Sequence, residues 1–145
     1  MTTTDKLTNS VSKKRLWTGR IITGLVGLFL TFDGLVKVLK LPPAVEGTAQ
    51  LGYPTTVVLG LGIVVLGCLA VYLIPRTSIV GAVLLTGYLG GAIATHLRVG
   101  SPLFTHTLFP IYVAVLIWGG LFLRDGRLRA LLASTSSATN RTSAA

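Results

Sequence analysis

Charged residues, and acidic residues above all, are scarce in this chain. Lys, Arg, Asp and Glu make up 12% of its 145 residues, whereas 51% are hydrophobic. An average soluble domain carries about 25% charged residues. The mean hydropathy is +0.75. This composition excludes a disordered chain and an ordinary soluble domain, and it favours a small one-domain protein embedded in a membrane.

Cysteine is almost absent as well. The single residue, Cys68, lies within an apolar run, so the chain cannot form an internal disulfide or a C-x-x-C redox pair. We expect Cys68 to act as a small packing residue, because free cysteine behaves as a small hydrophobe. The sequence also has no phosphate-binding loop and no H-E-x-x-H motif. Nothing in it indicates the catalytic chemistry of a soluble enzyme.

Long apolar runs are what the sequence does contain. Only helices and closed barrels satisfy the backbone within lipid, and these runs are too long and continuous for barrel strands. About 20 apolar residues cross a hydrocarbon core of about 30 Å. Prolines and a glycine-rich turn separate the runs. The pattern predicts an all-α integral membrane bundle of four antiparallel transmembrane helices, at about 16–37, 54–74, 77–95 and 107–123, with a short interfacial helix at about 43–52.

Polar segments flank this predicted membrane domain of residues 16–125. We expect residues 1–15 to be a flexible basic tail and residues 126–145 to be basic and then disordered. The net charge of +9 fits membrane topology better than nucleic-acid binding, because the basic residues sit at the ends of apolar runs. Ten of the thirteen Lys and Arg residues fall on the side of the two termini. The positive-inside rule therefore predicts that both termini are cytoplasmic.

Asp33 is the most informative polar residue. It follows Arg20 by thirteen residues, or about 20 Å of helix, so it lies near the opposite membrane boundary. A carboxylate there is costly and should face the bundle interior with a partner. Lys37, one helical turn later, is the local partner. Two interpretations stay open: a structural ion pair, or a buried carboxylate that serves ligand binding or proton transfer.

Other uncommon polar residues gather at the same predicted end. The loop between the third and fourth predicted transmembrane helices is flanked by His96, Arg98 and His106. A histidine can relay protons near neutral pH, and Arg98 can hold an anionic group or anchor the helix at the interface. Ten residues between two histidines is not a recognised metal-ligand spacing, so we expect no metal site. The candidate ligand-binding residues are Asp33, Lys37, Tyr53, Tyr88, His96, Arg98 and His106.

A stripe of small residues marks the third apolar run. Gly87 and Gly91 form a G-x-x-x-G pair, and Thr95 continues it. Such a stripe allows close helix packing in membranes. We expect it to pack inside the bundle, with a homodimer contact as the alternative.

Several short motifs together resemble those of the DoxX-like membrane protein family. The similarity covers about Trp17 to Asp125. It implies a multi-pass protein of the bacterial plasma (inner) membrane. The family takes its name from a small subunit linked to a quinone-dependent thiosulfate-oxidising system, and some relatives are associated with redox stress complexes. No agreed catalytic residues come with it. The motifs are Phe32–Lys37, Leu51–Pro54, Leu73–Thr77, Thr86–Ala92 with Thr95 and His96, and His106–Pro110.

Three functions are compatible with these features. The first is a non-catalytic accessory or assembly subunit of a membrane redox system. The second is a binder or oxidoreductase for a lipophilic small molecule such as a quinone, held in an outward-facing polar pocket. The third is a small oligomeric transporter. The expected partners are the lipid bilayer, a membrane redox protein and a second copy of the chain, with no role for nucleic acid.

Overall fold

The computed structural model describes residues 3–131, with side chains from Lys13 onward, and all regular structure in that range is helical. This confirms the all-α class. A further helical stretch covers residues 126–131, and the tail expected beyond it lies outside the described residues. The elements are α1 (Thr3–Val38), α2 (Pro42–Gln50), α3 (Val57–Leu73), α4 (Ser78–Arg98), the π-helical turn η1 (Leu103–Thr107) and α5 (Phe109–Arg124).

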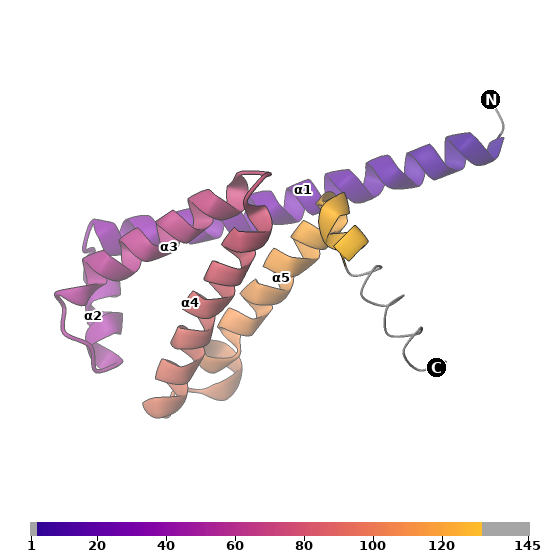
Figure 1. The fold of residues 1–145 in the computed structure, drawn as a ribbon. Coiled ribbons are helices and arrows are strands. Elements are labelled where there is room, and N and C mark those ends of the chain that lie inside the picture. The colour runs from indigo at the N-terminus through magenta and orange to yellow at the C-terminus, as the bar shows by residue number, and fades with distance from the viewer. Residues whose placement is uncertain (1–2, 132–145) are drawn as a thin grey trace, which may run out of the picture.

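Helix α1 starts much earlier than the hydropathy indicates. It begins at Thr3, so the segment that we expected to be a flexible tail is a continuation of the helix. The stretch Thr3–Thr18 contains no proline or glycine that would break a helix. Figure 1 shows this extension projecting beyond the other helices.

The helices form two pairs that run in clearly different directions (Figure 1). Helix α3 runs back along α1, and α5 runs back along α4, so each pair is antiparallel. Helix α1 also contacts α5, which joins the two pairs. Consecutive helices α3 and α4 diverge from their shared turn but still contact each other. The antiparallel arrangement of four membrane crossings stays a prediction.

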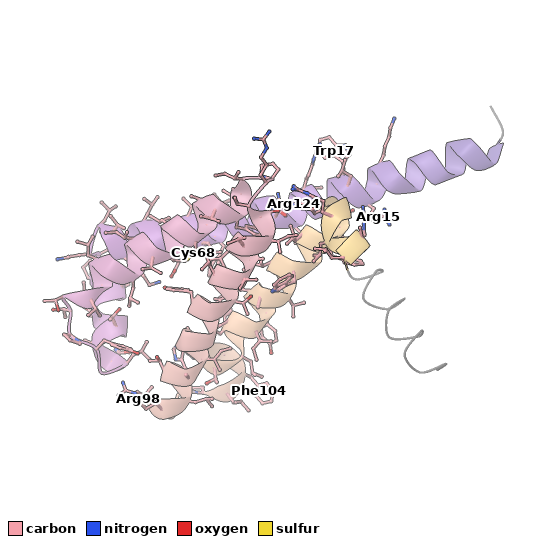
Figure 2. All side chains as sticks on the ribbon, in the orientation of Figure 1. Arg15, Trp17, Cys68, Arg98, Phe104 and Arg124 are labelled. Atoms are coloured by element: carbon pink, nitrogen blue, oxygen red, sulfur yellow. The ribbon has the colours of Figure 1, made fainter. Side chains whose placement is uncertain are left out.

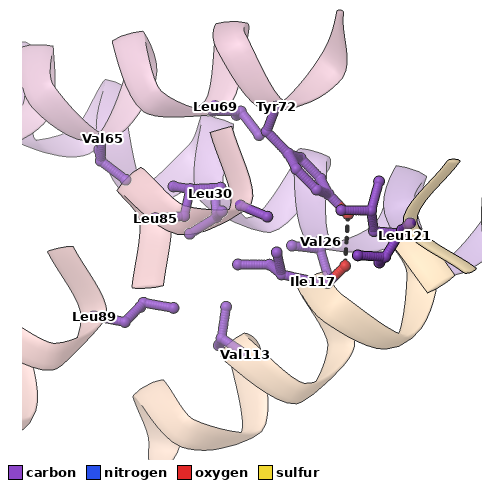
Figure 3. Close-up of a cluster of buried hydrophobic side chains, with 12 residues drawn as sticks. Val26, Leu30, Val65, Leu69, Tyr72, Leu85, Leu89, Val113, Ile117 and Leu121 are labelled. Atoms are coloured by element: carbon purple, nitrogen blue, oxygen red, sulfur yellow. Dashed lines mark hydrogen bonds between the residues drawn. The ribbon is translucent and has the colours of Figure 1, made fainter. Parts of the chain in front are cut away.

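Apolar side chains from α1, α3, α4 and α5 meet in one core (Figure 3). Leu30, Leu85 and Ile117 are almost completely buried there. Tyr72 is also fully buried, and its hydroxyl donates a hydrogen bond of 3.0 Å to the carbonyl oxygen of Ile117. Cys68 packs against the edge of this core, as a small hydrophobe does.

In the part of the chain that the structure describes, three helical segments are long and apolar enough to cross a membrane: Lys13–Val38, Ser78–Arg98 and Leu103–Arg124. Helix α3 is equally apolar, but its 17 residues span about 25 Å. It starts at Val57 rather than at Pro54 because Pro54 belongs to a turn, in which its carbonyl oxygen accepts a hydrogen bond of 3.1 Å from the Val57 amide. The fourth crossing stays a prediction.

Candidate functional site

A cavity of about 640 Å³ lies at the end of the molecule that carries α2. We name it the Asp33–His96 cavity. Its walls come from α1, α2, the end of α4 and the loop that leads into η1. Four of the seven predicted candidates line it, at positions that are far apart in the sequence. The polar lining residues are Asp33, Lys37, Thr48, Gln50, His96, Ser101 and His106.

Asp33 and Lys37 form the ion pair that their i, i+4 spacing predicts. The Lys37 ammonium donates a hydrogen bond to the Asp33 carboxylate. Both side chains are half-buried, with 33% of Asp33 and 18% of Lys37 exposed. An ammonium has three donors and a carboxylate has two acceptor oxygens, so one hydrogen bond leaves capacity on both groups. The pair can therefore be structural and still contact a molecule in the cavity.

Two histidines that line the cavity lie close to each other. The ring centroids of His96 and His106 lie 5.9 Å apart, because the turn after α4 and the π-helical turn η1 fold the chain back. Nδ1 of His96 lies 3.0 Å from Ser101 Oγ, and Nδ1 of His106 lies 2.8 Å from Thr105 Oγ1. These bonds leave Nε2 of each ring for another partner. Within residues 13–131, whose side chains the structure describes, no three His, Cys, Asp or Glu side chains gather closely enough to hold a metal ion.

Arg98 and Tyr53 lie beside the cavity and tie its walls together. The Arg98 guanidinium donates a hydrogen bond of 2.8 Å to the Leu51 carbonyl oxygen, and it lies 5.7 Å from the Tyr53 ring centre. The Tyr53 hydroxyl lies 3.0 Å from Thr95 Oγ1. These contacts join the end of α4 to the loop after α2. Gly52 has φ +79°, a backbone conformation that favours glycine, and so allows this loop to turn.

Tyr88 and the small-residue stripe do not reach the cavity. Tyr88 is half-buried and packs against the hydrophobic core. The expectation that Gly87 and Gly91 pack inside the bundle is wrong: both are exposed, and a Cβ added at either would meet no described atom within 4 Å. Thr95, the third residue of the stripe, is buried and contacts Tyr53, so only the glycines face away from the core. We call the exposed residues Gly87, Gly90 and Gly91 the α4 glycine face.

A second pocket, of about 230 Å³, lies at the opposite end of the molecule. Its lining includes Arg20 of α1 and Arg124 of α5. The sequence alone indicates only that basic residues flank the apolar runs at this end. It does not show that α1 and α5 bring Arg20 and Arg124 together. Figure 2 shows Trp17 and Arg124 at this end and Arg98 at the other.

Residues 21–120 match the family model described as the DoxX-like family. No curated protein and no solved structure gives a significant match.

Proposed function

This chain belongs to the DoxX-like family, and we propose that it is a membrane protein that binds a lipophilic small molecule with a polar head, such as a quinone, in the Asp33–His96 cavity. The observation that carries the proposal is the convergence of Lys37, His96 and His106 on one cavity. Its volume of about 640 Å³ is typical of small-molecule sites.

The chemistry of the lining suits a carbonyl-bearing head group. Carbonyl oxygens accept hydrogen bonds, and the Lys37 ammonium and an imidazole N–H can donate them. The cavity also has apolar walls, which include Val36, Leu51 and Val99. Exposed apolar side chains continue along α1 next to it, with Phe32 68% and Leu35 46% exposed. An apolar tail could lie along this surface while the head occupies the cavity.

The proposed location is the bacterial plasma (inner) membrane, with both termini cytoplasmic. This orientation is supported by the distribution of Lys and Arg: ten of the thirteen fall on the side of the termini. The cavity would then open on the periplasmic or extracellular side. Ionisable residues near a membrane boundary commonly mark sites of function.

Equilibrium binding of a short-chain quinone to the detergent-purified protein tests the proposal. We expect Lys37→Met to weaken binding about tenfold or more, because a hydrogen bond from a charged donor contributes about 1.5–3 kcal/mol. Lys40→Met is the matched control, since Lys40 is exposed and does not line the cavity. His96→Leu should also weaken binding. Failure of the wild type to bind quinone, or equal losses in both lysine variants, would overturn the proposal.

A second candidate function is an accessory or assembly subunit of a membrane redox system, and the α4 glycine face supports it. Small residues on a lipid-facing surface let another transmembrane helix approach closely. Such a partner would be a membrane redox protein or a second copy of the chain. The two functions are compatible, since the glycine face and the cavity involve different residues of α4.

A further inference from the structure

The pocket at the end opposite the Asp33–His96 cavity is built from basic side chains. We name it the Arg124 pocket. Arg20 comes from α1, one turn after Leu16, and Arg124 closes α5. Arg127 follows in the next helical stretch. Ser78, the first residue of α4, and Pro75 complete the wall together with Asp125.

The single carboxylate in the pocket is already engaged. Asp125 Oδ1 accepts a hydrogen bond of 2.8 Å from the Arg127 amide and lies 3.6 Å from Arg127 Nε. Its other oxygen accepts a hydrogen bond of 3.3 Å from the Ser78 hydroxyl. Asp125 therefore offsets the charge of Arg127, and the positive charges of Arg20 and Arg124 remain unbalanced by any group that lines the pocket.

Arg124 is held in place by Tyr72, and one of its N–H donors has no partner. One of its terminal nitrogens donates a hydrogen bond of 3.1 Å to the Tyr72 carbonyl oxygen, and the guanidinium lies 4.9 Å from the Tyr72 ring centre. Its Nε is buried and has no hydrogen-bond partner among the described residues. Buried donors are normally paired. Arg20 likewise forms no hydrogen bond or ion pair within residues 13–131, which leaves its whole guanidinium fork for a ligand.

We infer that Arg20, Arg124 and Arg127 form a binding site for a phosphate group, as carried by the head of an anionic phospholipid or by a free phosphate ion. Guanidinium groups bind phosphate oxygens through paired, charge-assisted hydrogen bonds. The Ser78 hydroxyl has one proton, which it already donates to Asp125, so the arginines supply the donors for the phosphate.

The surroundings suit a lipid as the source of this phosphate. Leu16 lines the pocket, and the neighbouring Trp17 is 63% exposed (Figure 2). Tryptophan is enriched at the level of lipid head groups. The orientation proposed above places the pocket at the cytoplasmic leaflet, where basic pockets between transmembrane helices bind acidic lipid heads. The site is distinct from the Asp33–His96 cavity and does not depend on its ligand.

Native mass spectrometry of the detergent-purified protein, titrated with phosphatidylglycerol or phosphatidylcholine, tests the inference. We expect one phosphatidylglycerol to bind more tightly than phosphatidylcholine. Arg20→Gln should weaken its binding about fivefold, the effect of one basic residue near an anionic lipid surface. Arg127→Gln is a second variant that leaves the Arg124 contacts with Tyr72 intact. Arg76→Gln is the matched control, because Arg76 is exposed on the adjacent turn and does not line the pocket.

Competition with inorganic phosphate, against chloride at equal ionic strength, separates the two sources. If phosphate displaces the lipid and chloride does not, the free ion occupies the site. If the lipid is retained in phosphate, its acyl chains contribute to binding. Either result supports a phosphate site. The inference is overturned if the wild type does not prefer phosphatidylglycerol. It is also overturned if Arg76→Gln weakens binding as much as Arg20→Gln does, since that would indicate a diffuse charge effect.

Discussion

Gly81 of α4 lies directly against the backbone of Tyr72 in α3: a Cβ atom added at position 81 would be 2.2 Å from the Tyr72 nitrogen. The tight turn after α3 brings the first turn of α4 this close. Backbone atoms cannot move aside as a flexible side chain can. Glycine is therefore required at position 81 by contact, whatever its cost in helix propensity.

The variant Gly81→Ala should lower the free energy of unfolding by about 1–3 kcal/mol, the usual cost of overpacking a core. Gly87→Ala in the same helix is the matched control, because its added methyl group meets no described atom. Alanine there should have no effect or stabilise α4 by up to about 1 kcal/mol. Unfolding of the detergent-purified variants, followed by circular dichroism, gives both values. Equal stabilities would contradict the contact at Tyr72.

The buried hydroxyl of Tyr72 gives a second test of the packing. It donates a hydrogen bond to the Ile117 carbonyl oxygen and lies 3.4 Å from Thr23 Oγ1, so it links α3 to α5 and α1. Tyr72→Phe should reduce the free energy of unfolding by about 0.5–1.5 kcal/mol. Tyr112→Phe, at a 50% exposed position, should leave it unchanged. A Tyr72→Phe protein as stable as the wild type would mean that this hydroxyl contributes nothing to the core.

The local features of this fold could be predicted from the sequence. Hydropathy locates four apolar helices, and the prolines mark where they are separated. The Asp33–Lys37 pair could also be predicted, because i, i+4 contacts depend only on helix geometry. The match over residues 21–120 confirms the resemblance to the DoxX-like family.

The features that depend on tertiary packing could not be predicted. A G-x-x-x-G spacing does not show which neighbour covers it, and Gly87 and Gly91 face outward while Gly81 makes the close contact. His96 and His106 meet only because η1 folds the chain back. The Arg124 pocket requires the start of the apolar part of α1 to meet the end of α5. The helical segment 3–15 was missed because hydropathy locates membrane spans and not the helical turns that extend them.

A double-mutant cycle on Asp33 and Lys37 separates the two interpretations of this pair. Asp33→Asn and Lys37→Met should each destabilise the protein, and the double variant should be more stable than the sum predicts, by about 0.3–1 kcal/mol. Glu46→Gln is the control for loss of an exposed carboxylate. We expect the double variant to recover stability without recovering quinone binding, since the charged donor is gone. Recovery of both would reduce the pair to a structural role.

The α4 glycine face predicts a contact with another transmembrane helix. Gly87→Leu should leave the stability of the isolated protein within about 0.5 kcal/mol, because surface substitutions that meet no neighbour have little effect. It should nevertheless block close approach of a partner helix. Gly60→Leu is the matched control, an exposed glycine on α3 whose Cβ also meets no described atom.

Cross-linking in membranes reads out this contact. Ala94 is exposed on α4 beyond the glycine face, so Ala94→Cys in a Cys68→Ala background places one reactive thiol beside it. A disulfide-linked dimer would identify a second copy as the partner, and a thiol-reactive cross-link of another mass would identify a different membrane protein. Either product should disappear with Gly87→Leu and persist with Gly60→Leu. A monomer in every variant would leave lipid alone against α4 and remove the observation that supports an accessory subunit.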